Sequence, residues 1–436
     1  MKLQLLSLAC MLSTGSWAQS TLIPDPVFEL LLIEAGLDEF PQDGEVLTAS
    51  IDTVTTLNLF TSGSTNVTDL SGIGDFVALE YLMVNFAELT SLDLSQNLSL
   101  QELHAYANDI HTLLLPPTES LIYLEMTGNP IGSLDVSQNP MLEFLSCSYC
   151  ELSELDVSGN PELRSISVMV NTLSILDVNE NLLLESLSCG VNELMDLDVS
   201  GNTLMKTLGC STNNIGALEL SQMDSLNYLG CNSNQLTSLD IQANQGLTYL
   251  DCSDNQIASL DASNHPEMIE LFCQYNELES LEVSPGIIGL NCSGNQLNAL
   301  DVSGVLNLAY FFDCSVNPLT CVQVSEAQIS DIPDFWVADD EDVFSLDCNS
   351  SGMMPSGSEE WMVRLFPNPT HDSFQLVWEG ESSRNLIIYD ALGSAIRSDE
   401  VIWSGASIAA PSSPGSYLLE LRGASEKSSM MHLLVH

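Results

Sequence analysis

Apolar side chains recur along the middle of this chain with a period of 21 residues. They stand at the first, fourth, sixth and eleventh positions of the repeating unit, as in Leu142, Leu145, Cys147 and Leu152. The register holds from Leu79 to Met268, and we count 12 regular units after an irregular one over residues 54–70. A period of this size predicts a solenoid, in which each coil buries its apolar side chains against its neighbours.

The ninth position of the unit is asparagine in most coils. A stacked column of these side chains can hydrogen-bond the backbone at a bend, where a tight turn leaves polar groups unpaired. The column consists of Asn108, Asn129, Asn171, Asn192, Asn213, Asn234, Asn255, Asn276 and Asn295. The second half of the unit alternates, as in Leu239-Asp240-Ile241, which predicts a second short extended segment rather than a helix.

The complete motif, L-x-x-L-x-C-x-x-N-x-L, resembles that of leucine-rich repeats over residues 54–324. The short coil makes the chain similar to bacterial internalin-like proteins. The resemblance implies a mainly β, helix-poor leucine-rich-repeat solenoid of 21-residue coils.

Residues 19–53 and 325–350 are predicted to cover the two ends of the solenoid, because an end coil exposes one apolar face. Asp25, followed by Pro26 and an amphipathic run to Glu34, predicts a helix with an acidic N-cap. The apolar residues available to cover the rear end are Ile332, Phe335, Trp336 and Phe344.

The first 18 residues predict a secretory signal peptide. Lys2 supplies the positive charge, Leu3 to Leu12 the apolar stretch, and Ser16-Trp17-Ala18 a small-x-small cleavage site. A lipid anchor at Cys10 is the weaker alternative. We therefore expect an exported protein.

Residues 361–436 follow a linker at 351–360 and contain short alternating segments separated by turn residues, which predicts a small β-sandwich. Three motifs in it, LFPNPT from Leu365, IYDALG from Ile388 and PGSYLL from Pro414, resemble the C-terminal sorting domain of type IX secretion cargo. The resemblance implies the type IX machinery as a partner, passage through the outer membrane, removal of the domain and attachment to lipopolysaccharide. An ordinary adhesive β-sandwich is the alternative.

The charge is strongly one-sided, with 60 acidic and 8 basic residues and a formal net charge of −52. Such a polyanion is repelled by nucleic acid and by anionic lipid, so we expect neither as a partner. Its 45% hydrophobic content excludes a chain that is disordered throughout.

Eight of the 12 cysteines stand at the sixth position of the unit: Cys147, Cys189, Cys210, Cys231, Cys252, Cys273, Cys292 and Cys314. One thiol per coil, all pointing the same way, suits neither a tetrahedral metal site nor a series of disulfides. We interpret these cysteines as small buried hydrophobic residues. Cys321 and Cys348 lie outside the column, and we predict that they form a disulfide.

No motif in the chain predicts catalysis, and the six histidines have no metal-ligand spacing. We therefore expect no enzyme activity, no cofactor and no metal. A column of acids could bridge Ca²⁺, although each site would offer few ligands and a solvated stripe is the favoured interpretation. It contains Asp135, Asp156, Asp177, Asp198, Glu219, Asp240, Asp261, Glu282 and Asp301.

Aromatic side chains gather on the outward side of the predicted inner strands, in two groups separated by a Ser- and Gly-rich stretch. They are Tyr81, Tyr106, Tyr123, Phe144, Tyr149, Tyr228, Tyr249, Phe272 and Tyr275. Aromatic residues on a rigid concave sheet can supply binding hot spots or stack on sugar rings, although isolated exposed aromatics carry no meaning by themselves.

Together these features favour a secreted, cell-surface-displayed binding protein, exported by type IX secretion, whose ligand is an unknown extracellular protein or glycan. A structural surface-layer component that associates through bridging cations is the alternative, and an enzyme is the least favoured class.

Overall fold

The computed structural model describes residues 19–59, 66–330, 332–333, 335–339 and 344–348, together with Pro411 and strands between residues 363 and 435. The chain divides into two compact units, residues 1–348 and 349–436, and each is described by itself. The predicted signal peptide (1–18) and linker (351–360) lie outside the described residues, as do the turns of the sorting-domain motifs.

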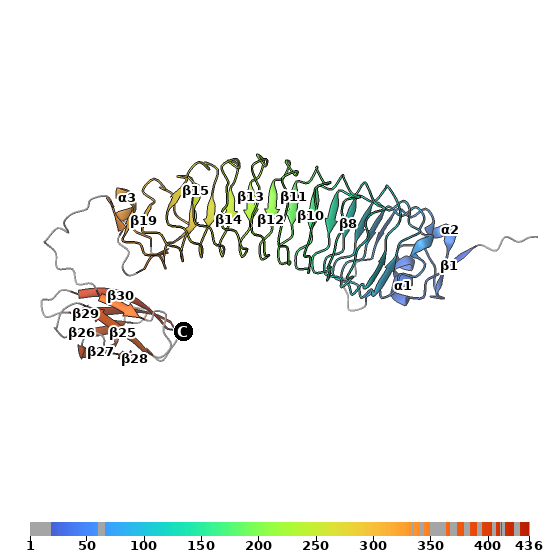
Figure 1. Cartoon of the computed structure of the whole chain (residues 1–436). Helices are drawn as coiled ribbons and strands as arrows, with labels where there is room; N and C mark the ends of the chain where they lie inside the picture. The colour runs from blue at the N-terminus through green and yellow to red at the C-terminus, as the bar shows by residue number, and fades with distance from the viewer. Residues whose placement is uncertain are drawn as a thin grey trace, which may run out of the picture. The chain divides into compact units, whose positions relative to one another are not determined.

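A parallel sheet of 14 short strands runs along the first unit (Figure 1). The fourth-position leucines of adjacent coils are register partners, for example Leu187 with Leu208. The strands are β3 (Thr56–Asn58), β4 (Tyr81–Met83), β6 (Glu102–His104), β8 (Tyr123–Glu125), β9 (Phe144–Ser146), β10 (Ser165–Ser167), β11 (Ser186–Ser188), β12 (Thr207–Gly209), β13 (Tyr228–Gly230), β14 (Tyr249–Asp251), β16 (Glu270–Phe272), β18 (Gly289–Asn291), β20 (Phe311–Asp313) and β22 (Trp336–Val337). The prediction of a mainly β, helix-poor solenoid with coils of about 21 residues is confirmed.

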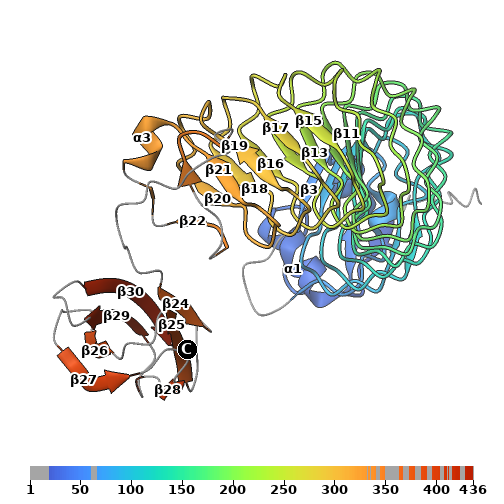
Figure 2. The same ribbon diagram turned by 60° about the vertical axis from the view of Figure 1, so that its left-hand side comes forward.

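The second half of the coil pairs with its neighbours at only some places. These strands are β5 (Ser91–Asp93), β7 (Thr112–Leu114), β15 (Leu260–Ala262), β17 (Leu281–Val283), β19 (Ala299–Asp301), β21 (Cys321–Gln323) and β23 (Phe344–Ser345). Leu239–Ile241 is not paired as a strand. A turn follows this segment, in which the Asn244 N–H donates to the Ile241 carbonyl at 2.9 Å. Figure 2 shows the strands of the large sheet following one another along the solenoid.

The core is one continuous column of buried leucine, isoleucine, valine and cysteine side chains. All eight sixth-position cysteines and Cys150 are buried and form no disulfide. Burial raises the pKa of the Cys210 thiol to about 12, so the thiol stays protonated at neutral pH. The cysteines therefore act as core residues, as the parallel column predicts.

The ninth-position asparagines form the expected ladder along the bend. The Asn213 side chain donates to the carbonyls of Cys189 and Cys210 and accepts from the N–H of Leu194. The residue before each ladder asparagine adopts a left-handed conformation even where it is bulky, as at Val170, Val191 and Tyr275. This strained position was not predicted, because no residue type marks it.

A second asparagine ladder, also not predicted, lies at the nineteenth position. It contains Asn97, Asn139, Asn160, Asn181, Asn202 and Asn244, all fully buried. Asn181 donates to the carbonyls of Val157 and Asn160 at 3.0 and 2.9 Å. His265 takes the same place further along, with its Nε2 2.9 Å from the Ile241 carbonyl oxygen. This ladder ties neighbouring coils together on the side opposite the first ladder.

The N-terminal end carries the helix that Asp25 and Pro26 predict, α1 (Pro26–Glu34). Phe28 and Leu32 of this helix are buried, and the Phe28 ring stacks on Phe76 at 6.1 Å. The other elements here are the antiparallel strands β1 (Ser20–Leu22) and β2 (Glu45–Leu47), the helix α2 (Thr48–Ile51) and the 3₁₀-helix η1 (Ile73–Asp75).

At the rear of the solenoid, α3 (Glu326–Ile329) precedes β22. Trp336 is buried, and its indole N–H donates to the Leu308 carbonyl at 3.2 Å. Ile332 and Phe335 were expected to cover the last coil, but they are 37% and 43% exposed. Phe335 lines an open pocket together with Leu308 and Trp336, so it covers this end of the solenoid less completely than Trp336 does.

Cys321 and Cys348 form a disulfide in this rear region. The bond joins β21 to the segment after β23. It therefore holds the end of the first unit against its last coils, as the sequence predicts.

The second unit contains two antiparallel sheets within its described residues. One has the order β24-β25-β28 and the other β27-β26-β29-β30. The strands are β24 (Val363–Phe366), β25 (Ser373–Trp378), β26 (Arg384–Tyr389), β27 (Ala395–Ile402), β28 (Ser407–Ala409), β29 (Gly415–Arg422) and β30 (Ser428–Val435). The packing of these sheets as a sandwich stays a prediction.

Candidate binding surface on the parallel sheet

The outward side chains of the large sheet come from the third and fifth positions of each unit, on either side of the buried leucine. The burial pattern of most strands has this alternation, as in β8, where Leu124 is buried between two partly exposed residues. We call the surface made by these side chains the sheet face. Because the strands are parallel and in register, equal positions of successive coils lie about 4.8 Å apart.

Four rings line up over the first strands of the sheet face, and we call them the first aromatic stack: Tyr81, His104, Tyr123 and Phe144. The ring centroids are 5.2, 4.5 and 4.2 Å apart in that order. The last two rings are almost parallel, with an interplanar angle of 2°. His104 was not predicted to belong to this group, because it stands at the fifth position and reaches the third-position column sideways.

Two carboxylates accompany the first stack. The His104 Nδ1 lies 3.3 Å from Glu125 Oε2, and its Nε2 lies 3.5 Å from Glu102 Oε2. Burial, followed by the nearby charge of Glu125 and Glu102, raises the pKa of the Tyr123 phenol. At this stack the acids therefore already face a histidine of the chain itself.

A second aromatic stack lies over β13 to β20 and consists of Tyr228, Tyr249, Phe272 and Phe311. Their centroids are 4.6, 5.7 and 4.9 Å apart in that order. Phe311 was missed in the sequence, because one extra residue in the last coil shifts it relative to the 21-residue period. Gly289 makes room for it: a β-carbon there would lie 2.4 Å from the Phe311 ring.

Three carboxylates stand among the rings of the second stack. Asp251 follows Tyr249 on β14, Glu270 precedes Phe272 on β16, and Asp313 lies on β20. Burial raises the pKa of the Tyr249 phenol to about 12, and the charges of Asp251 and Glu270 contribute to the rise. The phenol is therefore neutral at physiological pH and can donate or accept a hydrogen bond.

The remaining predicted aromatics lie outside the two stacks. Tyr149 and Tyr275 occupy left-handed turn positions with φ of 55° and are 62% and 57% exposed. The Tyr106 ring packs edge-on against Phe86 at 4.9 Å, beside the first stack. The sequence placed all three with the strand aromatics, but their positions in the unit put them at the rim of the sheet face.

Small side chains separate the two stacks. Ser165, Ser186 and Thr207 occupy the third position of β10, β11 and β12. Beside them runs a row of alternating charges in which Arg164 contacts Glu143 and Glu185, and Lys206 also contacts Glu185. Two of the 8 basic residues of the chain are thus used within one row.

The acidic column lies on the other half of the coil, where its carboxylates serve the turns. Asp135 Oδ1 accepts the N–H of Ser137 at 3.0 Å, and the same contact recurs between Asp156 and Ser158. Hydrogen bonds from Ser137 hold the pKa of Asp135 below its ordinary value. These two acids therefore stabilise local turns in their charged form, which supports the solvated interpretation.

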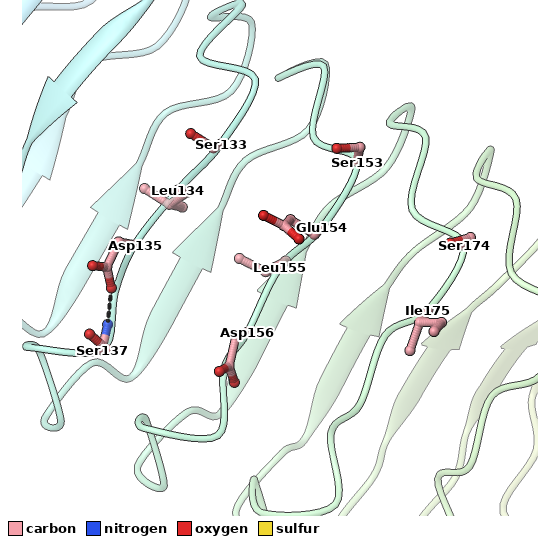
Figure 3. Close-up of a pocket in the computed structure, with 10 residues that line it drawn as sticks. All are labelled: Ser133, Leu134, Asp135, Ser137, Ser153, Glu154, Leu155, Asp156, Ser174 and Ile175. Atoms are coloured by element: carbon pink, nitrogen blue, oxygen red, sulfur yellow. Dashed lines mark hydrogen bonds between the residues drawn. The ribbon is translucent and has the colours of Figure 1, made fainter.

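An open cavity of about 550 Å³ lies between these turns. Figure 3 shows Asp135 on one coil and Glu154 and Asp156 on the next coil, around this cavity. No group of three or more histidine, cysteine, aspartate or glutamate side chains suited to a metal occurs in the part of the chain that the structure describes. The cavity has no concentration of ligating groups, so the sheet face is the better candidate surface.

Known proteins of similar structure indicate which fold this geometry belongs to. No family model matches the chain, and no curated protein matches its sequence. Among solved structures, the functional domain of InlJ from Listeria monocytogenes, which includes a cysteine ladder, aligns with a TM-score of 0.61 and 24% identity over 96% of this chain and 99% of that one. The chain has the leucine-rich-repeat fold.

Two further leucine-rich-repeat structures agree. A protein of Leptospira interrogans aligns with a TM-score of 0.55 and 21% identity over 68% of this chain and 81% of that one. An internalin of Listeria monocytogenes, InlF, gives 0.52 and 19% over 70% and 96%. The leucine-rich-repeat solenoid is typically a scaffold for binding proteins rather than for catalysis. No helix in the described residues is long and apolar enough to cross a membrane.

Proposed function

We propose that this protein is an exported, cell-surface-displayed, non-enzymatic binding protein that takes a protein or glycan ligand on its sheet face. The observation that supports the proposal best is the pair of aromatic stacks, in which the centroids of neighbouring rings lie 4.2 to 5.7 Å apart. Rings held by their neighbours lose little conformational entropy on binding, so their contact area is converted into affinity more fully.

Export rests on the two ends of the sequence. Residues 1–18 act as the signal peptide, and residues 361–436 form the β-sandwich that the type IX machinery recognises and removes. The solenoid lies between these two ends of the sequence. Residues 19–53 close its first end, and residues 325–350 close its last end. The mature protein then remains at the cell surface, where it is attached to lipopolysaccharide.

The alternative function is a surface-layer component whose acidic columns are bridged by cations. The described residues contain no group of three or more histidine, cysteine, aspartate or glutamate side chains suited to a metal, which weighs against it. Light scattering of the purified chain with and without Ca²⁺ separates the two: assembly that requires Ca²⁺ favours the alternative.

The binding proposal predicts that three aromatic substitutions remove affinity. A glycan and protein array first identifies a ligand, and the triple variant Tyr228→Ala, Tyr249→Ala and Phe272→Ala is then compared with the unchanged chain. Each lost hot spot is expected to weaken binding by about 1 kcal/mol or more. The control replaces Asp198, Asp240 and Asp261 with asparagine and should leave the affinity nearly unchanged. Loss of binding in the control alone would move the site to the acidic column.

The export proposal predicts that deleting residues 361–436 abolishes surface display but not folding of the solenoid. The reason is that the chain divides into separate compact units at residue 349. Immunolabelling of intact cells measures display, and circular dichroism of the periplasmic product measures folding. Display of the truncated chain would contradict the proposal.

A further inference from the structure

The sheet face carries charge of one sign. At the third and fifth positions of strands β3 to β20 the ionisable residues other than tyrosine are five carboxylates and one histidine, and neither lysine nor arginine occurs there. The carboxylates are Glu102, Glu125, Asp251, Glu270 and Asp313. A ligand that covers this face must desolvate several negative charges, which is unfavourable unless the ligand returns positive ones.

The two stacks differ in what their carboxylates already contact. In the first stack, Glu102 and Glu125 both face His104. In the second stack no histidine, lysine or arginine of the described residues forms an ion pair with the three acids. Asp251 and Asp313 each use Oδ1 to accept from the serine two positions later. Their turns fix both carboxyl groups in place beside the rings.

We propose that the sheet face over β13 to β20 docks a basic polypeptide segment whose lysine or arginine side chains lie along the second aromatic stack and reach Asp251, Glu270 and Asp313. This inference rests on the proposed binding function and names the class of ligand. It excludes a neutral glycan as the main ligand of this part of the face.

The chemistry of long basic side chains fits the arrangement. Lysine and arginine bury their aliphatic stems on apolar surface and keep the charged head at its edge. The rings of the second stack are half-buried by one another, and Tyr228 remains 38% exposed. Arginine also has a planar guanidinium group, which can stack on an aromatic ring and at the same time donate hydrogen bonds to a carboxylate. The five strands of the stack span about 19 Å, which an extended segment of about six residues covers.

The test uses the full chain and a fluorescent peptide of about eight alternating arginine and threonine residues. A second peptide carries citrulline, which keeps the size and planarity of arginine without its charge. We expect the arginine peptide to bind at least tenfold more tightly. Equal binding of the two peptides would overturn the inference.

Any polycation is attracted to a chain with a net charge of −52, so the site needs a matched control. One triple variant carries Asp251→Asn, Glu270→Gln and Asp313→Asn. The other carries Asp261→Asn, Glu282→Gln and Asp301→Asn, which changes the net charge equally on the other half of nearby coils. The first should weaken binding of the arginine peptide roughly tenfold and the second less than twofold. Equal losses in both would mean a nonspecific charge effect and would overturn the inference.

The two proposals can fail separately. Suppose that an array ligand no longer binds when Tyr228, Tyr249 and Phe272 are replaced with alanine, but still binds when the sheet-face carboxylates are neutralised. The binding function then stands and the basic-ligand inference falls. If neither the aromatic nor the acidic substitutions change binding of that ligand, the sheet face is not the site and both fall.

Discussion

Replacing Asp25 with alanine is expected to destabilise the N-terminal end of the solenoid by about 3 kcal/mol. Its carboxylate accepts five hydrogen bonds and is 4% exposed. Oδ1 caps α1 through the N–H groups of Val27 and Phe28, at 2.8 and 2.9 Å. Oδ2 accepts from the N–H and hydroxyl of Thr68 and from the N–H of Asp69. One side chain thus joins the helix to the start of the repeats, and its loss leaves buried donors without a partner.

Hydrogen exchange measures this effect locally, which matters because distant coils of a solenoid can unfold separately. Amide protection should fall over α1 and around Thr68 and stay unchanged beyond Tyr228. Asp25→Asn keeps only one carbonyl oxygen and should lose part of the stability. The control is Asp43→Ala, because Asp43 is exposed and accepts a single hydrogen bond, from Glu45. Protection that is equal in Asp25→Ala and in the control would refute the role of Asp25.

The same carboxylate makes this end sensitive to acid. Burial raises the pKa of Asp25, but hydrogen bonds from Phe28, Thr68 and Val27 outweigh it and hold the pKa below the ordinary value of 3.8. A group whose pKa is lower in the folded chain stabilises it at higher pH and loses this contribution as the pH falls through the folded pKa. The N-terminal end should therefore lose stability progressively as the pH falls below the ordinary pKa of 3.8, and this loss should be absent in Asp25→Asn.

The repeat itself could be predicted from the sequence because its signal is periodic. The leucines, the sixth-position cysteines and the first asparagine ladder all recur at one spacing, so a single register places them together. The N-terminal helix could be predicted for a local reason, since Asp25 and Pro26 are capping residues. The rings of Tyr228 and Tyr249 stack because they share one position in adjacent coils.

The features that were missed depend on how the backbone bends rather than on residue type. Asn160 and Asn181 follow turn residues, where asparagine is usually solvated, and nothing in the sequence says that the side chain points inward. The left-handed eighth position is held by residues as different as Phe86, Val170 and Asp254, since the ladder around it imposes the conformation. Phe311 was missed because an insertion breaks the period, and Gly289 explains only afterwards why its ring fits.

The second asparagine ladder carries the other large effect we expect. Asn181→Asp should destabilise the central coils by about 4 kcal/mol at neutral pH. The amide of Asn181 is fully buried and donates to two backbone carbonyls, those of Val157 and Asn160. Aspartate has nearly the same shape but no donors in its charged form, so it sets a negative charge against two carbonyl oxygens. The second carboxylate oxygen of the new aspartate would also lack a donor, because it takes the place of Asn181 Oδ1, which accepts no hydrogen bond.

The stability of Asn181→Asp should depend on pH in the opposite direction from the stability that Asp25 contributes. A buried carboxyl group facing acceptors has its pKa raised, so the folded chain keeps the proton and is most stable below the unfolded pKa. Stability is then lost as the pH rises through the folded pKa, because the charged form is driven out of the core. Urea unfolding and hydrogen exchange around β10 and β11 at acidic and neutral pH measure the difference. Asn179→Asp makes the same chemical change two residues away on an exposed side chain and should cost little at any pH. If the two variants are equally stable at neutral pH, the ladder does not hold the coils together, and their cohesion must come from the apolar column alone.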